Sequence, residues 1–187
     1  MTNPLSKKAP GTILTVGHGR RSLQEFAELL NSFAVTLVVD VRTIPRSRHN
    51  PQFNRETLPE DLASQGISYH HQPGLGGLRK TRPDSINSGW HNSAFRGFAD
   101  YMQTDAFRSS LDELINMASG QIPALMCAES LPWRCHRSLI ADALLIRGIP
   151  VLHLFKPGLA EAHQLTGFAR VNDTVITYPE LPSVGNL

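Results

Sequence analysis

The chain has 187 residues, of which 41% are hydrophobic and 18% are charged, and its formal net charge is +2. This composition is typical of a soluble globular protein, and the length predicts one domain that can bury a core without disulfides or a structural metal. Two cysteines are too few for a disulfide scaffold. There is no signal-peptide pattern and no run of about 18 apolar residues, so we expect no membrane contact and a location in the cytoplasm, where thiols stay reduced.

The predicted elements alternate between strands and helices along the chain. Strands are expected at residues 12–16, 34–41, 67–70, 122–127 and 150–155. Helices are expected from residue 22, over 57–65, over 95–118 in two pieces that meet near Thr104 and Asp105, over 135–147, and briefly after Lys156. Ser22 with Glu25, and Thr57 with Glu60, have the spacing of a capping box at a helix start.

This alternation predicts the fold class and the domain limits. Strands separated by helices favour an α/β fold with a mostly parallel, doubly wound sheet of about five strands and Rossmann-like or flavodoxin-like layering. We expect a polar leader over residues 1–11, a single α/β domain over 12–180 that ends in a β-rich segment, and a tail over 181–187. Residues 72–92 are rich in Gly, Pro and polar side chains and are expected to form a long loop, which in a compact domain is often functional.

The charge is unevenly distributed. Residues 1–82 carry eleven of the 18 Lys and Arg but only six of the 16 Asp and Glu. The densest basic stretch holds Arg42, Arg46, Arg48 and Arg55, with no acidic residue between Asp40 and Glu56. Guanidinium groups bind phosphate or carboxylate oxygens in pairs, so this stretch indicates an anionic partner or, alternatively, a solvated basic loop.

Polar side chains follow every predicted strand. They include His18, Arg20 and Arg21 after the first, Asp40 and Arg42 after the second, Tyr69, His70 and His71 at the third, Cys127, Glu129, Arg134, Cys135 and His136 after the fourth, and His153 in the fifth. The carboxyl ends of parallel strands meet at one edge of the sheet, and ligands bind there. We therefore expect these groups to converge on one crevice.

The most distinctive segment runs from Met126 to Ser138 and holds both cysteines. Cys135 lies where a polar loop joins a helix, and a helix start together with Arg134 and Arg137 would stabilise a thiolate there. Cys135 is thus the better candidate nucleophile, whereas Cys127 ends an apolar strand, where a small core residue is the commoner role. A metal is not predicted, but if one is present its ligands are Cys127, Cys135 and His136.

Some of these polar groups have structural alternatives. Asp40 could act as a general base, could orient a histidine, or could form a buried ion pair with Arg42, which is the commoner arrangement. A single histidine such as His70 or His71 is more often a hydrogen-bonded polar group than a ligand.

Several motifs occur together in the order found in one family. They are Thr15-Val-Gly-His-Gly19, Asp40-Val-Arg-Thr-Ile-Pro-Arg-Ser47, Phe53-Asn54, Gly66-Ile-Ser-Tyr69, Leu75-Gly-Gly77, Phe98-Ala-Asp-Tyr101, Cys127-Ala-Glu129 and Cys135-His-Arg137. In these motifs the chain resembles the bacterial and archaeal domain-of-unknown-function 488 family from about Ile13 to Tyr178. Members typically have Ser or Thr where this chain has Gly19. The resemblance implies a set of motif positions but no reaction and no cofactor.

These observations lead to one main hypothesis and two alternatives. The main one is a cytoplasmic enzyme that binds a phosphate-bearing small molecule or nucleic acid. Arg42, Arg46, Ser47, His136 and Arg137 would bind the anion, and His18, Asp40, Glu129 and Cys135 would carry the chemistry. The alternatives are a nucleic-acid-binding module without catalysis and a metal-binding or thiol redox protein.

Overall fold

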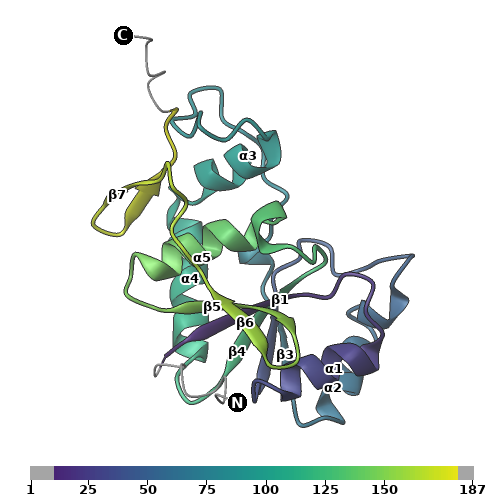
Figure 1. The fold of residues 1–187 in the computed structure, drawn as a ribbon. Helices are drawn as coiled ribbons and strands as arrows, with labels where there is room; N and C mark the ends of the chain where they lie inside the picture. Colours follow the sequence, from purple (N-terminus) through teal and green to yellow (C-terminus); the bar gives the residue numbers. More distant parts are fainter. Residues whose placement is uncertain (1–10, 181–187) are drawn as a thin grey trace.

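Figure 1 shows the computed structural model, which describes residues 11–180. The predicted tail over residues 181–187, and the predicted leader up to residue 10, lie outside the described residues.

Six strands form one sheet at the centre of the molecule. They are β1 (Ile13–Gly17), β2 (Leu37–Asp40), β3 (Ser68–His71), β4 (Pro123–Cys127), β5 (Val151–Lys156) and β6 (Leu159–Ala162). Their order across the sheet is β3-β2-β4-β1-β5-β6, and every neighbouring pair is parallel except β5 with β6. The predicted α/β fold with a mostly parallel sheet is confirmed, with six strands instead of about five.

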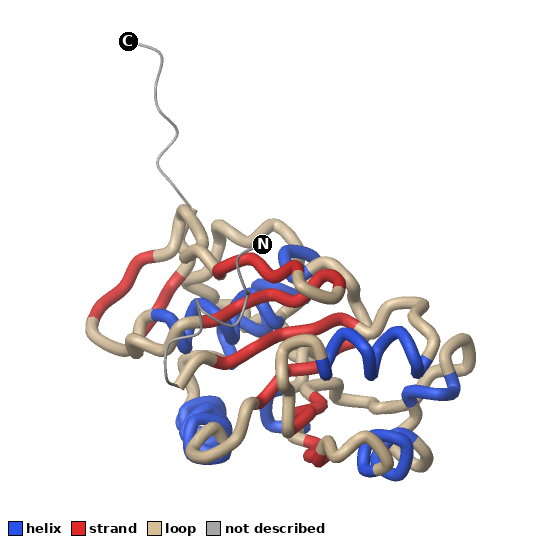
Figure 2. Tube along the Cα trace, turned by 60° about the horizontal axis from the view of Figure 1, so that its bottom comes forward, coloured by secondary structure: helices blue, strands red, loops and turns tan. Residues whose placement is uncertain are grey.

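Helices cover both faces of the sheet (Figures 1 and 2). The helices α1 (Leu23–Asn31) and α2 (Leu58–Ala63) pack on one face, and α3 (Ser93–Tyr101), α4 (Asp105–Met117) and α5 (Arg137–Leu145) contribute to the core on the other. Every residue of β1 and β2 is buried, which explains why these strands are almost entirely apolar. Whether this layering is Rossmann-like or flavodoxin-like stays a prediction.

The helix starts confirm one capping box and contradict the other. The Ser22 hydroxyl accepts a hydrogen bond from the Glu25 amide, and the Glu25 carboxylate accepts one from the Ser22 amide. The prediction that Thr57 caps α2 is wrong, because its hydroxyl makes long contacts to the Pro51 and Asn54 carbonyls instead of bonding the helix. Thr104 caps α4 at the predicted break between α3 and α4.

The predicted short helix after Lys156 is also wrong. Gly158 has a φ of +74°, and this turn sends the chain back antiparallel to β5 as the edge strand β6. Beyond it, β7 (Arg170–Asn172) and β8 (Val175–Thr177) form a separate hairpin, in agreement with the predicted β-rich end of the domain. Backbone pairing at the sheet edge therefore overrides the local helical tendency.

The segment 72–92 is a loop, as predicted, apart from a 3₁₀ turn over Pro73–Leu75. The buried Asp100 carboxylate of α3 fixes this loop, because it accepts hydrogen bonds from the Arg82 amide at 2.8 Å, the Ser85 hydroxyl at 2.6 Å and the Asn87 side chain at 2.8 Å. Figure 1 shows the loop and α3 beside the β7–β8 hairpin. Anchored in this way, the loop places Gly77 and Leu78 against the site described below.

Candidate active site

A cleft of about 450 Å³ lies at the carboxyl ends of the central strands. Its lining combines segments that are far apart in sequence: His18, residues 42–44, Arg46, Ser47, Gly77, Leu78, Ala94, Phe95, residues 127–129 and residues 134–136. Both cysteines, His136 and Glu129 thus share one cleft with Arg42 and Arg46, which is the arrangement expected for parallel strands.

The sulfur of Cys135 is surrounded by groups that stabilise a thiolate. His136 Nδ1 lies 3.6 Å from it, and Nε of Arg137 donates to it at 3.4 Å. A hydrogen bond from the Cys127 thiol lowers the pKa of Cys135 well below its usual value, with help from His136 and Arg137 and against the effect of burial. The same hydrogen bond, together with burial, raises the pKa of Cys127 well above its usual value. Within this pair, the surroundings therefore favour Cys135 over Cys127 as the thiolate.

His136 is held so that one ring nitrogen faces this sulfur. Its Nε2 donates to the Val41 carbonyl at 3.2 Å, which leaves Nδ1 to accept a proton from Cys135. The ring also packs against Phe98 with a centroid distance of 5.0 Å. Gly77 makes room for the ring, because a Cβ at this position would lie 2.5 Å from Nδ1.

Arg137 lies behind Cys135 and does not line the cleft. It is 1% exposed, and its guanidinium contacts the Glu129 carbonyl and the Thr15 hydroxyl as well as the Cys135 sulfur. Helix α5 begins at Arg137, two residues later than predicted, and the amides of Ser138 and Leu139 already bond to the carbonyls of Cys135 and His136. The buried position directs the charge of Arg137 at the Cys135 sulfur and away from the cleft.

Asp40 and Arg42 form a buried ion pair. Nε of Arg42 donates to Oδ1 of Asp40 at 2.8 Å and Nη2 donates to Oδ2 at 2.5 Å, while the Tyr69 hydroxyl donates to Oδ2 at 2.7 Å. Nη2 of Arg42 also donates to the Phe53 carbonyl at 2.7 Å. Both carboxylate oxygens are thus occupied, and of the roles considered for Asp40 the geometry favours the ion pair with Arg42.

His18 is a neutral, fully bonded ring beside this pair. Its Nδ1 donates to the Gly19 carbonyl at 3.0 Å, and its Nε2 accepts from Nη1 of Arg42 at 3.3 Å. The ring stacks on Phe53 with a centroid distance of 4.2 Å. Burial lowers the pKa of His18 to about 4. At neutral pH this side chain carries no charge.

Of the polar side chains that line the cleft, two arginines are unpaired. Within residues 11–180, the guanidinium groups of Arg46 and Arg134 have no hydrogen-bond or ion-pair partner, and both residues are exposed. Oε1 of Glu129 accepts from the Leu131 amide at 3.1 Å, and the Ser47 hydroxyl accepts from the Asn50 amide at 3.1 Å. The cleft therefore presents two unpaired cations beside one carboxylate.

An apolar wall completes the cleft, and sequence reasoning did not assign it. Ile44 and Leu78 are 65% and 71% exposed, unusually high values for such side chains, and Phe95 lies with them. The loops at 43–47 and 77–78 that carry them could be recognised as loops, but not as neighbours. The cleft therefore combines an apolar wall with the two unpaired guanidinium groups.

Three atoms of the site have the spacing of metal ligands. The sulfurs of Cys127 and Cys135 and one ring nitrogen of His136 lie within 4.8 Å of one another. Two ligands of one tetrahedral zinc ion, with bonds of about 2.3 Å to sulfur and about 2.0 Å to nitrogen, are about 3.5 Å apart. The 3.6 Å between Cys135 and His136 fits this value.

The other residues predicted at strand ends lie outside the cleft. Nε2 of His71 contacts the Arg42 carbonyl at 2.9 Å, and His70 faces Glu113 at 3.8 Å on the surface. Arg21 instead bonds to the carbonyls of Gly17 and Phe155. These side chains stabilise the loops around the cleft without entering it.

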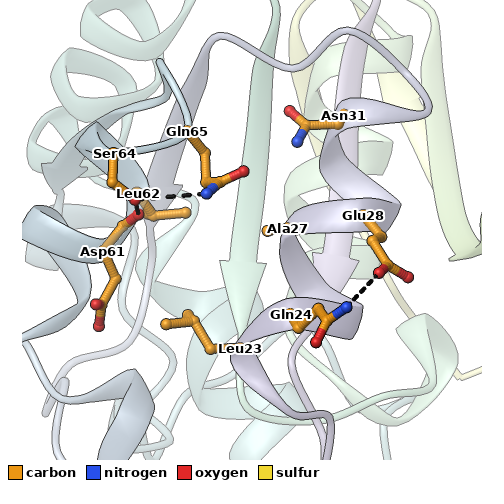
Figure 3. A pocket seen from close by; sticks show the side chains of 9 residues that line it. All are labelled: Leu23, Gln24, Ala27, Glu28, Asn31, Asp61, Leu62, Ser64 and Gln65. Atoms are coloured by element: carbon orange, nitrogen blue, oxygen red, sulfur yellow. Dashed lines mark hydrogen bonds between the residues drawn. The ribbon is translucent and has the colours of Figure 1, made fainter.

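A second hollow, of about 400 Å³, lies between α1 and α2 (Figure 3). Its lining holds no cysteine, histidine or arginine, and Gln24 in it donates to Glu28 at 2.9 Å. Surface side chains of two helices make up this hollow, and it carries no chemistry comparable with that of the cleft.

The comparisons place the sequence in a family but add no activity. The family model described as "Domain of unknown function DUF488" matches residues 22–144, which include most of the cleft. No similar curated protein and no similar solved structure were found. Within residues 11–180, no helix is long and apolar enough to cross a membrane.

Proposed function

The chain belongs to the DUF488 family, a domain of unknown function, and we propose from its own residues that it is an enzyme with the Cys135 thiolate as nucleophile and a phosphate-bearing substrate. The family match confirms the resemblance seen in the sequence, and the activity proposed here rests on the geometry of the cleft alone.

The environment of the Cys135 sulfur carries the proposal. Burial alone raises a thiol pKa, so a core cysteine in this position would stay protonated. Here a buried guanidinium, a second thiol and an imidazole all converge on the sulfur. Burying a charged Arg137 costs free energy unless an anion compensates it, and the thiolate is that anion.

The neighbouring residues have complementary roles. His136 takes the thiol proton on Nδ1, and the thiolate attacks an electrophilic centre of the substrate. A bond forms to sulfur, the bond to the leaving group breaks, and the leaving group receives the proton from His136. A water molecule then attacks the same centre and gives its proton to Nδ1 of His136, and the bond to sulfur breaks to release the product and restore the thiolate. Glu129 is placed to orient that water or the leaving group.

The substrate is proposed to be anionic because of the two free cations. Arg46 and Arg134 would bind its phosphate groups, while Ile44, Leu78 and Phe95 would contact an apolar or aromatic part. A nucleotide or the end of a nucleic acid has both features. A thiolate enzyme of this kind works in a reducing compartment, consistent with the cytoplasmic location expected from the sequence.

A second candidate function, metal binding by Cys127, Cys135 and His136, rests on their ligand-like spacing. The hydrogen bond from His136 Nε2 to the Val41 carbonyl is also typical of a ligating histidine. When bound there, zinc would supply a Lewis acid and an activated water to the cleft. Arg137 opposes this, because it already compensates the charge of the Cys135 sulfur at 3.4 Å. Elemental mass spectrometry of protein purified without chelator or histidine tag decides between the two.

Titration of the thiolate tests the main proposal. Ultraviolet absorbance of the thiolate against pH, in the wild type and in Cys135→Ser and Cys127→Ser variants, gives the pKa of each thiol. We expect Cys135 to titrate well below an ordinary thiol pKa of about 8.5 and to react with iodoacetamide at about pH 6. Inorganic phosphate or ADP should slow that reaction. An ordinary pKa for Cys135 would refute the proposal.

A further inference from the structure

A network of buried, hydrogen-bonded side chains leads away from the cleft behind Arg137. Nη1 of Arg137 donates to the Thr15 hydroxyl at 3.4 Å, and the Thr15 hydroxyl lies 2.7 Å from Nδ1 of His153. Nε2 of His153 lies 3.0 Å from Nδ1 of His163, whose Nε2 lies 2.8 Å from the Asp142 carboxylate. Its members after Arg137 come in turn from β1, from β5, from the segment after β6 and from α5.

The two ends of this network have fixed hydrogen-bond directions, because a carboxylate only accepts and a guanidinium only donates. Nε2 of His163 therefore donates to Asp142, and the Thr15 oxygen accepts from Arg137. The two inner links can run either way: with a neutral His163 the Thr15 hydroxyl donates to His153 and His153 to His163, and with a protonated His163 both links reverse. In both arrangements of protons the Thr15 oxygen remains an acceptor for Arg137.

The side chains of this network are buried, so they form hydrogen bonds with one another and not with solvent. Thr15 and Asp142 are 0% exposed, and the side chain of His163 is 6% exposed. Burial also lowers the pKa of His153 to about 3, so this ring is neutral. Asp142 has further partners in the Thr166 and Tyr178 hydroxyls, at 2.7 Å and 2.8 Å. Such a network costs more to bury than apolar side chains of the same volume, which indicates a role beyond packing.

We propose that Thr15, His153 and His163 are positioning residues that hold the Arg137 guanidinium in the orientation from which its Nε meets the Cys135 sulfur. This inference rests on the proposed thiolate function. Arg137 has three acceptors, the Cys135 sulfur, the Glu129 carbonyl and the Thr15 hydroxyl, and Thr15 is the one that the sheet interior supplies. Without it, the guanidinium plane can rotate about the remaining two contacts, and the hydrogen bond to sulfur weakens.

The test compares the pKa of Cys135 in variants at two positions of this network, Thr15 and His163. Thr15→Val keeps the shape of the side chain and removes the hydroxyl, while Thr15→Ser keeps the hydroxyl. We expect Thr15→Val to lower the acid dissociation constant of the Cys135 thiol by about threefold to tenfold in an ultraviolet titration, and Thr15→Ser to restore it. His163→Gln, which keeps a donor to Asp142 but removes the ring nitrogen that meets His153, should change this constant in the same direction.

Tyr178→Phe is the matched control. It removes another hydrogen bond from Asp142 without breaking the path to Arg137, so it should lower the unfolding temperature and leave the pKa of Cys135 unchanged. If Thr15→Val does not fold, as judged by circular dichroism, His163→Gln carries the test.

The outcomes separate this inference from the proposed function. A depressed wild-type pKa that neither Thr15→Val nor His163→Gln changes would overturn the positioning role and leave the thiolate proposal intact. An equal shift in Tyr178→Phe would overturn it too, because loss of packing would then explain the effect. An ordinary wild-type pKa would overturn both.

Discussion

Protonation of His18 should destabilise this protein at acidic pH. A surface histidine, whose pKa changes little on folding, would not have this effect. The ring is buried, and its Nδ1 donates to the Gly19 carbonyl while its Nε2 accepts from Nη1 of Arg42 at 3.3 Å. A second proton would sit on Nε2 and point at this positively charged donor. Its pKa is lowered from 6.5 to about 4. The unfolded chain therefore binds the proton more tightly than the folded one, and the free energy of unfolding falls as the pH drops from about 6.5 towards 4.

The size of the effect follows from the two pKa values. At about pH 5, a histidine with a pKa of 6.5 in the unfolded state and about 4 in the folded state removes about 2 kcal/mol of stability relative to neutral pH. His153, with a pKa of about 3, adds a similar loss. Carboxyl groups also contribute, but they titrate in the wild type and in a His18 variant alike.

A difference measurement isolates His18. Urea unfolding at about pH 7 and about pH 5 gives, for the wild type and for His18→Gln, the decrease in the free energy of unfolding between the two pH values. This decrease should be about 2 kcal/mol smaller in the variant, because glutamine cannot titrate. Equal losses in the two proteins would refute the assignment of His18 as a buried neutral ring.

Three further predictions concern the cleft and the side chains packed behind it. Arg137→Met removes the charge-assisted hydrogen bond to the Cys135 sulfur and should raise the pKa of that thiol by about one to two units in an ultraviolet titration; an unchanged titration would contradict the role of Arg137. Asp40→Asn leaves Arg42 buried without its counter-charge and should cost about 3–5 kcal/mol in urea unfolding, against about 1 kcal/mol for Tyr69→Phe, which removes one hydrogen bond. Gly77→Ala places a Cβ 2.5 Å from Nδ1 of His136 and should slow alkylation of Cys135 by displacing the ring, so a wild-type rate would show that the ring is not needed.

The general position of the site could be predicted from the sequence because topology determines it. Once the strands are expected to be parallel, the residues that follow them must meet at one edge, and His18, Arg42, Cys127 and Cys135 do so. Local sequence signals were equally informative where a side chain bonds a backbone amide a few residues away, as Ser22 and Glu25 do.

The partners of each side chain could not be predicted in the same way. Arg137 follows Cys135 and His136 in a polar segment, and nothing local shows that it turns inward to Thr15 instead of outward to a ligand. Asp142 and His163 escaped notice because each lies alone in its own segment, although an acidic residue within the apolar run of α5 was a possible signal. Such pairings depend on contacts between distant parts of the chain.

The position of β1 in the sheet has a consequence for how the polypeptide folds as it is synthesised. This strand, near the start of the chain, pairs with β4 and β5 and with neither β2 nor β3. Its apolar residues have no sheet partner until residues 123–127 and 151–156 have left the ribosome. Because pairing over such sequence separations closes long loops, folding should be slow and should wait for most of the chain. A ribosome-bound chain that stops before β4 would expose Ile13, Leu14 and Val16 to chaperones or to aggregation.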